Sequence, residues 1–297
     1  MVISTKEELF ELLGKIEPFE GKRVKTTMWG HKVDYVFADD LSYEMGFEYF
    51  SQFLNPDLES EANLTLYIDG GQVSVDEELC LNYHGIKHEG REILLTPFCC
   101  GSIGENVGTV VIVPGDELTL TALFRSISAN LTRRMRGIVL HSSGVVYKDK
   151  CFLFLGESGS GKSTVVKLSG SLITLSDEAI LITESENGFR CWGSPYGAEH
   201  PGTNLNVELA GCLFLVQDKE TYLEKLDGQE VVLRIAQQIW SDLSVIRFDP
   251  NNLSLCMKIA STVPCYNMHF ELNDSFWLAI DKEFFGGALD ECRSRRA

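Results

Sequence analysis

The 297-residue sequence lacks any apolar run that approaches the about 20 residues of a membrane-spanning helix. It has no charged start followed by an apolar core, so we expect no signal peptide. It is poor in positive charge, with 26 Lys and Arg against 43 Asp and Glu, a formal net charge of −17. Because an acidic surface repels nucleic acid and anionic lipid, we expect neither nucleic acid nor membrane as the main partner.

The nine cysteines form no framework, and the sequence has neither a C-x-x-C nor an H-E-x-x-H motif. Several of them lie inside apolar runs, where cysteine acts as a small buried hydrophobic residue. An odd number of scattered cysteines is typical of a reducing compartment. We therefore expect free thiols and a cytoplasmic protein.

The sequence also lacks internal repeats and low-complexity segments, and its 44% hydrophobic content supports a real core. Apolar residues alternate with a period of two over much of the first hundred residues, which predicts a mostly antiparallel sheet with one or two helices. Within it we expect a β-hairpin, with strands at 64–68 and 73–75, and a further strand at 79–83.

Asp116 is placed to begin a long helix that Gly137 ends, and another amphipathic helix is expected from about 230 to 243. Arg133, Arg134 and Arg136 near the end of the first helix either interact with its dipole or form a basic rim beside a phosphate site. We predict two domains. Residues 1–115 form an N-terminal α+β domain for substrate or partner recognition, and residues 116–297 form an α/β domain that carries the chemistry.

The chemistry of the second domain is indicated by a glycine-rich motif that matches G-x-x-x-x-G-K-[ST] without a mismatch. An apolar run at 151–155 predicts a buried strand before it, and residues 164–168 predict a helix after it. Strand, glycine loop and helix are the context that this nucleotide-binding motif requires. The predicted nucleotide-binding residues are Gly156, Glu157, Ser158, Gly159, Ser160, Gly161, Lys162, Ser163 and Thr164.

Each residue type in the motif has a chemical reason. Gly156, Gly159 and Gly161 allow the backbone to turn so that its N–H groups point at phosphate oxygens. Lys162 is expected to reach the β- and γ-phosphates of ATP, and the Ser163 hydroxyl to hold Mg²⁺.

A phosphate-transferring enzyme of this kind needs an acidic group at the metal, commonly at the end of an apolar strand. Asp177 follows the apolar residues 172–175 and lies 15 residues beyond Lys162, with Glu178 as its neighbour. One acid can hold Mg²⁺ while the other accepts the proton of an attacking hydroxyl. His141, 15 residues before Gly156, is a further catalytic candidate or a structural strand residue.

The second half of the chain resembles the HPr kinase/phosphorylase superfamily, and more closely its short HPr-kinase-like members. The resemblance covers roughly residues 118–283. It rests on His141-Ser-Ser-Gly-Val-Val, the glycine motif, Leu-Ser-Asp177-Glu178, Trp192-Gly-Ser-Pro-Tyr-Gly197, Val263-Pro-Cys-Tyr266 and Phe276-Trp277. The resemblance implies a phosphate-loop core shared with ATP-dependent phosphoenolpyruvate carboxykinase. It also implies ATP and Mg²⁺ as cofactors, and a role for the His141 position.

The chain departs from the HPr kinases at two points. They carry two aspartates where this chain has Asp177 and Glu178, and their later glycine-rich segment with a functional arginine has no clear counterpart, residues 197–202 occupying that region. The resemblance therefore carries ATP binding and phosphoryl transfer, but not HPr as the substrate.

We expect an ATP- and Mg²⁺-dependent kinase with Lys162, Asp177, Glu178 and His141 as catalytic residues. Its acceptor is a hydroxyl, most simply serine, on a peptide, protein or small metabolite, and homo-oligomer formation stays open. The alternative is a catalytically weak nucleotide-binding regulatory or scaffold protein. A switch or motor NTPase is disfavoured, because the chain has no N-K-x-D motif and no L-S-G-G-Q signature downstream.

Overall fold

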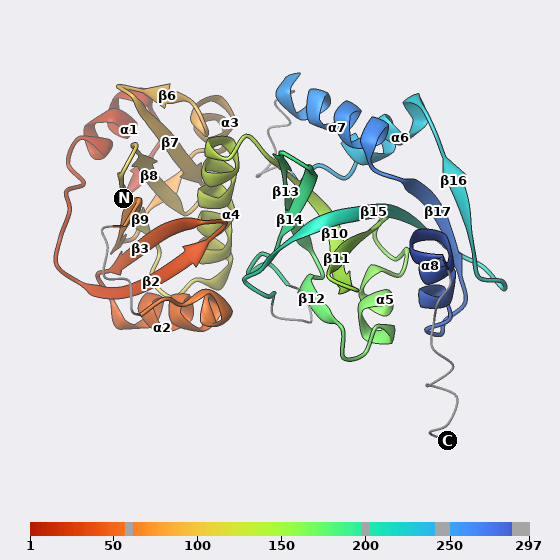
Figure 1. The fold of residues 1–297 in the computed structure, drawn as a ribbon. Helices are drawn as coiled ribbons and strands as arrows, with labels where there is room; N and C mark the ends of the chain where they lie inside the picture. Colours follow the sequence, from red (N-terminus) through yellow and green to blue (C-terminus); the bar gives the residue numbers. More distant parts are fainter. Residues whose placement is uncertain (57–61, 198–201, 241–249, 287–297) are drawn as a thin grey trace. The chain divides into compact units, whose positions relative to one another are not determined.

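A computed structural model describes residues 1–56, 62–197, 202–240 and 250–286 of the chain. It is a mixed α/β structure with several sheets, drawn in Figure 1. The chain divides into two compact units, with the division after Arg134. The sequence predicts a boundary at 115/116, before the long helix, whereas the contacts of that helix group it with the first unit.

The first unit is built on a seven-stranded sheet in the order β2-β3-β4-β9-β8-β7-β6. The β3–β4 and β4–β9 pairs are parallel and the others are antiparallel, so the sheet is mostly antiparallel as expected. Its elements are β1 (Val2–Ile3), α1 (Lys6–Leu13), β2 (Lys22–Met28), β3 (His31–Phe37), α2 (Asp40–Tyr49), a 3₁₀ turn (Ser51–Phe53), β4 (Leu64–Gly70), β5 (Ser74–Val75), α3 (Glu77–Tyr83), β6 (Lys87–His88), β7 (Arg91–Thr96), β8 (Cys99–Ile103), β9 (Val107–Ile112) and α4 (Glu117–Arg134).

Two local predictions in this unit are wrong. The expected hairpin does not form, because β4 lies between β3 and β9 and has both edges occupied, while β5 pairs with β1. Residues 79–83 belong to the helix α3, whose N-cap Asp76 accepts a 2.8 Å hydrogen bond from the Glu78 amide. Leu79 is buried and Leu81 is exposed, so their spacing of two residues is not the alternation of a strand.

Helix α4 is tied to the first unit by polar contacts from its last two turns. Arg133 pairs with the buried Glu92 of β7, which also accepts a 2.8 Å hydrogen bond from Asn130. Arg134 donates to the Gly104 carbonyl oxygen at 2.8 Å. Arg133 thus binds a residue of the sheet and Arg134 binds the turn between β8 and β9, so neither the dipole nor the basic-rim interpretation describes their main contacts.

The second unit is organised around two long strands that each pair on both sides. Residues 138–141 of β10 pair with β13, and later residues pair with β11 and β12. Likewise, β15 pairs first with β14 and then, in parallel, with β11 and β17. The elements are β10 (Ile138–Tyr147), β11 (Lys150–Leu155), α5 (Lys162–Leu168), β12 (Ile173–Ser176), β13 (Ala179–Ser185), β14 (Gly188–Trp192), β15 (Asn206–Gln217), β16 (Tyr222–Leu226), α6 (Gln229–Ala236), α7 (Pro250–Thr262), β17 (Cys265–Phe270) and α8 (Phe276–Phe285).

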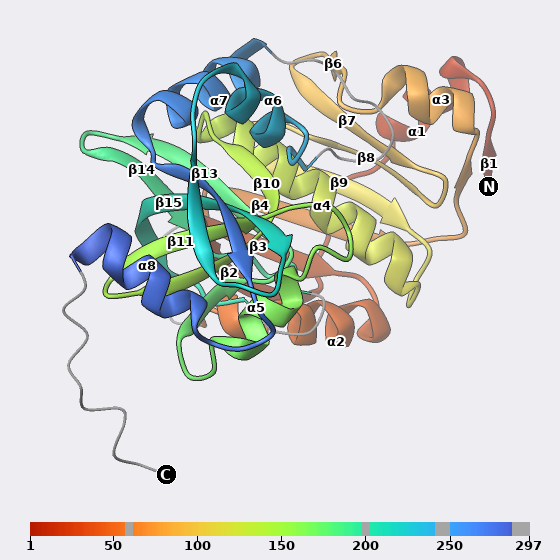
Figure 2. The same ribbon diagram turned by 90° about the vertical axis from the view of Figure 1, so that its right-hand side faces the viewer.

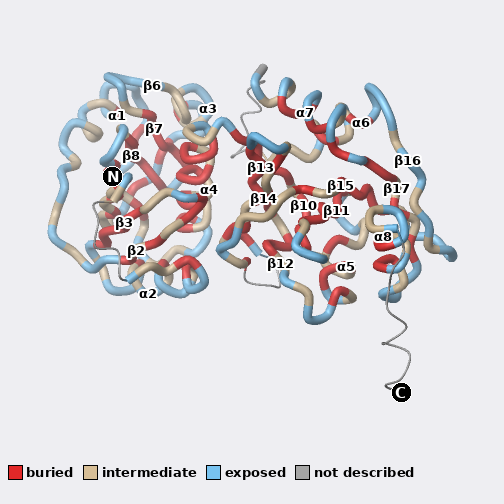
Figure 3. Tube along the Cα trace, in the orientation of Figure 1, coloured by how far each residue is buried: buried red, intermediate tan, exposed pale blue. Residues whose placement is uncertain are grey.

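Strand β11 is the centre of three layers, because its side chains alternate between two cores. Cys151, Leu153 and Leu155 pack with residues of α6 and α7. Phe152 and Phe154 pack on the other side with residues of α5 and α8. The two views of Figures 1 and 2 agree that α6 and α7 lie on one side of these strands and α5 and α8 on the other. Figure 3 shows the central strands as largely buried.

The eight cysteines in the described part of the chain are free, and all except Cys80 are buried. Among the described residues, no helix combines the length and the hydropathy of a membrane span.

Candidate functional site

The glycine loop, residues 156–161, lies where three parallel strands of the second unit end. Strand β11 leads into it, and β15 and β17 end beside it. Gln217, the last residue of β15, donates a 3.2 Å hydrogen bond to the Gly159 carbonyl oxygen. The carboxyl ends of parallel strands are a common place for ligand sites in α/β proteins. Strand, loop and helix therefore follow one another here as the motif requires.

The backbone of the loop needs glycine at specific positions. Gly159 and Gly161 have φ of +81° and +109°, in the left-handed region that glycine favours. A Cβ at position 161 would lie 2.9 Å from the Phe270 ring, and one at position 156 would lie 2.6 Å from Ser160 Oγ. Side chains at these two positions would therefore displace groups that shape the loop.

Lys162 begins α5 and folds back over the loop. Its ammonium donates to the carbonyl oxygens of Gly156 at 2.7 Å and Glu157 at 3.2 Å. The residue is 7% exposed, and burial lowers the pKa of its ammonium, while the negative charge of Glu178 partly opposes the shift. A buried cation is thus held at the mouth of a glycine loop, close enough to Glu178 to feel its charge.

A buried hydroxyl inside the loop tests whether an oxygen-rich ligand fits. Among the described residues, Ser160 Oγ is buried and makes no hydrogen bond. Buried polar groups normally have a partner, so an unpaired hydroxyl needs an explanation. A phosphate oxygen beside the loop would supply one, so the loop is suited to hold phosphate.

Asp177 and Glu178 lie at the same edge of the unit as the loop. The backbone oxygen of Asp177 accepts a 3.0 Å hydrogen bond from Ser143 Oγ, and that of Glu178 accepts one of 3.1 Å from the Ser142 amide. Ser142 is in turn the register partner of Leu155, the residue before the loop. Strand β10 therefore joins the acidic pair to the loop. Asp177 is 3% exposed, and Glu178 is half-buried.

His141 is also brought to this edge, on β10 next to Ser142. It is half-buried and pairs with Ala179, the residue after the acidic pair. Its backbone amide donates a 2.7 Å hydrogen bond to the Gln238 carbonyl oxygen. The backbone of His141 therefore has a structural role. A catalytic role for its side chain stays a prediction.

The residues available to a metal ion are a hydroxyl and two carboxylates. Ser163 is half-buried in the first turn of α5, and Asp177 and Glu178 lie at the loop edge. Within the described ranges, no group of three or more His, Cys, Asp and Glu side chains is arranged to hold a metal by itself. Mg²⁺ commonly takes only one or two carboxylates and completes its shell with water and substrate phosphates. The donor set therefore fits Mg²⁺ bound together with a nucleotide.

A cavity of about 430 Å³ opens beside the loop and contains a residue that the sequence pattern did not single out. Its lining consists of residues 156–160 of the loop, Phe214 and Leu215 of β15, Arg234 of α6, and Gln237 and Gln238 after that helix. The sequence predicted a helix over Arg234 but carried no signal that this helix faces the loop. Residues 197–202 occupy the region of the glycine-rich segment that carries a functional arginine in the HPr kinases, but residues 198–201 lie outside the described residues.

No protein-family model matches the sequence, and no curated protein does either. Among solved structures, the chain is similar to one described as the Hpr(Ser) kinase/phosphatase from Coxiella burnetii. The similarity has 13% sequence identity and a TM-score of 0.25, and it covers 41% of this chain and 88% of that chain. This is a distant structural similarity, and the chemistry of the site rests on its own residues.

Proposed function

We propose that the protein is an ATP- and Mg²⁺-dependent kinase that transfers the γ-phosphoryl group to a hydroxyl. The observation that carries the proposal is the position of Lys162, buried over a glycine loop and within the electrostatic influence of Glu178. A cation, backbone amides and an acidic pair at one strand edge are the parts that phosphoryl transfer needs.

In the proposed reaction, a bond forms between the acceptor oxygen and the γ-phosphorus. The bond between that phosphorus and the bridging oxygen of the β-phosphate breaks, and ADP leaves. The hydroxyl proton passes to a carboxylate of Asp177 or Glu178. Lys162 and the amides of the loop neutralise charge on the β- and γ-phosphate oxygens, and the role of His141 beside the acidic pair is a weaker part of the proposal.

Mg²⁺, when bound, would be held by Ser163 and the acidic pair and would neutralise charge on the phosphates. The burial of Asp177 keeps one carboxylate in place, and the Ser143 hydrogen bond fixes the backbone that carries it. The half-buried Glu178 is the more accessible of the two to an incoming hydroxyl. We therefore assign metal binding mainly to Asp177 and proton acceptance mainly to Glu178.

The acceptor is proposed as a serine or other hydroxyl of a peptide, protein or small metabolite. The first unit, up to Arg134, carries no phosphate-binding motif and is proposed to recognise that acceptor or a partner protein. A cytoplasmic location is part of the same proposal, because the cytoplasm provides both ATP and reducing conditions.

The test is ATP turnover by the purified chain with Mg²⁺ and a γ-³²P-labelled donor, in extract separated into protein, peptide and metabolite pools. We expect label in one pool from the wild type and its loss in Lys162→Ala and in Asp177→Ala. A matched control is Asp149→Asn. Asp149 is an exposed acid in the turn between β10 and β11, at the end of β11 away from the loop, so this variant should transfer label as the wild type does.

Two results would contradict a kinase. ATP binding without label in any pool, in the wild type itself, would leave a nucleotide-binding regulatory protein. Label that persists in Lys162→Ala would place the activity elsewhere or in a contaminant.

A further inference from the structure

The cavity beside the glycine loop has one wall made by the loop and another made by α6. Its volume of about 430 Å³ is within the usual range of small-molecule sites. The carbonyl oxygens that receive Lys162 belong to Gly156 and Glu157, which also line the cavity. The Lys162 ammonium therefore contacts a part of the loop that also lines the cavity, and the motif is expected to place the β- and γ-phosphates beside this lysine.

Arg234 carries positive charge on the α6 wall of this cavity. Its guanidinium carbon lies 4.3 Å from the centre of the Phe214 ring, a cation–π arrangement. One terminal nitrogen donates a 2.7 Å hydrogen bond to Asn267 Oδ1, and the same nitrogen lies 3.7 Å from Glu230. The guanidinium is thus stacked and held at one corner. The guanidinium has five N–H donors, and both of these polar contacts involve the same terminal nitrogen.

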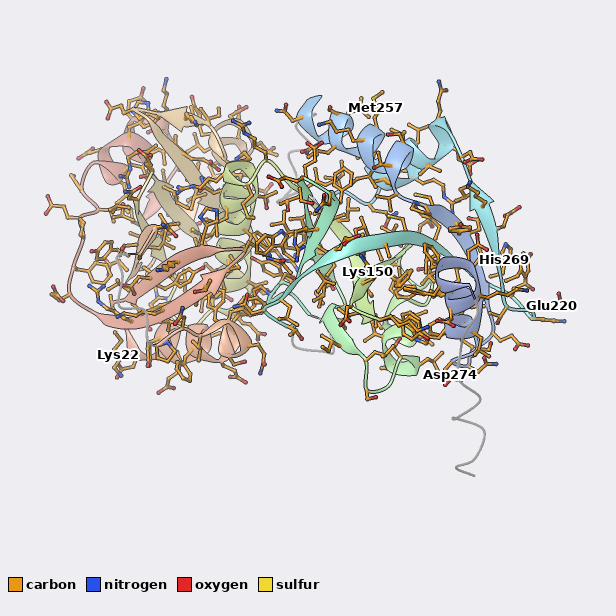
Figure 4. All side chains as sticks on the ribbon, viewed as in Figure 1. Lys22, Lys150, Glu220, Met257, His269 and Asp274 are labelled. Carbon is orange, nitrogen blue, oxygen red and sulfur yellow. The ribbon has the colours of Figure 1, made fainter. Side chains whose placement is uncertain are left out.

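The support for Arg234 continues along β16 and β17. Asn267 donates a 2.8 Å hydrogen bond to Glu224, and Glu224 lies 3.8 Å from a ring nitrogen of His269. The other ring nitrogen of His269 contacts Asp218 at 2.9 Å. His269, labelled in Figure 4, lies on β17 where that strand pairs with β16. This row of polar side chains keeps Asn267, and through it Arg234, in one orientation.

The helix that carries Arg234 is itself anchored to the sheet. Val231 and Ile235, on either side of Arg234 in the helix, are completely buried in the core beneath it. After the helix, the Gln238 carbonyl oxygen accepts the hydrogen bond from the His141 amide. Arg234 therefore lies on a rigid element, as a residue that recognises a charged group should.

We propose that Arg234 binds the γ-phosphate of the nucleotide and stabilises its charge during transfer. The proposal deepens the kinase proposal and rests on it. Lys162 reaches the phosphates along the loop, whereas Arg234 faces them across the cavity. A guanidinium donates two parallel hydrogen bonds to phosphate oxygens, and an arginine supplied within the same chain has this role in other phosphoryl-transfer sites. The site should therefore distinguish a nucleoside triphosphate from a diphosphate.

The test needs no acceptor, because it compares binding of ATP and ADP by calorimetry with Mg²⁺ present. We expect Arg234→Gln to weaken ATP binding by about 10-fold or more, the loss of a charge-assisted hydrogen bond, and to change ADP binding by less than about 2-fold. Arg234→Lys keeps the charge without the fork and should lie between. The matched control is Arg190→Gln, because Arg190 is also half-buried and bound to an asparagine, Asn206, but does not line the cavity.

A positioning test separates the recognition of γ-phosphate from a general effect on folding. Asn267→Ala leaves Arg234 in the chain but removes its 2.7 Å hydrogen bond, so the ATP-over-ADP preference should fall part of the way. Each variant is checked by thermal unfolding.

The results can separate this proposal from the kinase proposal. Equal loss of ATP and ADP binding in Arg234→Gln, or an unchanged ratio between them, would overturn the assignment of Arg234 alone. An unchanged ratio in binding, accompanied by loss of label transfer, would instead place an anionic acceptor on Arg234 and would also overturn it. A wild type that binds neither nucleotide would overturn both proposals.

Discussion

The ammonium of Lys162 donates a 2.7 Å hydrogen bond to the carbonyl oxygen of Gly156, six residues before it in the same loop. Together with the Glu157 contact, this bond spans the loop and keeps its two ends together. A phosphate that enters the loop must compete with these two carbonyl oxygens for the cation. Since phosphate is a charged acceptor and a carbonyl is neutral, the exchange is expected to favour phosphate.

Replacing Lys162 with Met should separate ligand binding from folding. The methionine has a similar length and no charge to bury, so we expect the free energy of unfolding without nucleotide to change by no more than about 1 kcal/mol. ATP affinity should fall by about 100-fold, or about 3 kcal/mol, with the lost charge-assisted hydrogen bonds. Urea unfolding and calorimetric titration measure the two effects. A large loss of stability would show that the cation serves mainly to hold the loop together.

Two glycines of the loop should respond differently to alanine. Gly161→Ala combines a φ of +109° with a Cβ 2.9 Å from the Phe270 ring, and should cost about 3 kcal/mol of unfolding free energy. Gly159→Ala has a φ of +81° but open space around the Cβ, and should cost only about 1 kcal/mol. Chemical denaturation of both variants tests the difference. Equal costs would mean that Phe270 moves aside freely.

The acidic pair should control the effect of Mg²⁺ on nucleotide binding. We expect Asp177→Asn to remove most of the gain in ATP affinity that Mg²⁺ gives the wild type, a change of about 10-fold, because a carboxylate at the metal is lost. Glu178→Gln should keep more of the gain and lose more of the transfer rate. The measurement is the ATP dissociation constant with Mg²⁺ and with chelator, using Asp149→Asn as the control. An undiminished Mg²⁺ effect in Asp177→Asn would exclude it as a metal ligand.

The reaction of the half-buried Cys80 and the buried Cys100 with a thiol reagent should be slow at neutral pH and become faster as pH rises. Burial raises the pKa of Cys80 to about 11 and that of Cys100 to about 12. Near pH 8 these thiols should react with iodoacetamide at least about 100-fold more slowly than an exposed cysteine of pKa about 8.5, and Cys100 more slowly than Cys80, because their thiolate fractions are smaller. The rate should rise towards pH 11, and mass spectrometry of labelled peptides from a Cys292→Ser variant measures it. Fast labelling at pH 8 in the folded protein would contradict the burial.

The same shift has a defined sign for stability. A thiol whose pKa is higher in the folded than in the unfolded state binds its proton more tightly when folded. Its contribution is fully present below the ordinary value of 9.0 and is lost as pH rises towards about 11 for Cys80. Stability in urea should therefore decline above pH 9, and replacing Cys80 and Cys100 with alanine should reduce that decline.

The parts of the protein that follow from neighbouring residues could be predicted from the sequence. The strand, loop and helix follow in order from the apolar run at 151–155, the glycines and Lys162. They could be predicted because an apolar run and glycines that adopt positive φ are recognised without knowing any distant contact. The acidic pair at the end of an apolar strand was found by the same local logic. What remained a prediction is its chemical role.

The predictions were wrong or incomplete where the structure depends on pairing or packing between residues far apart in the sequence. Strand β4 does not form the expected hairpin, because β3 and β9 pair with its two edges. The alternation of apolar residues along a strand does not reveal which strands it pairs with. Arg234 lies 78 positions after Gly156 (234 − 156), and only the folding of α6 onto the sheet brings it to the loop's cavity. The conformation of the glycine loop is thus determined by adjacent residues, because backbone conformation depends mainly on its neighbours in the chain. The groups that face the loop were decided by tertiary structure, because the burial of Val231 and Ile235 determines where α6 lies.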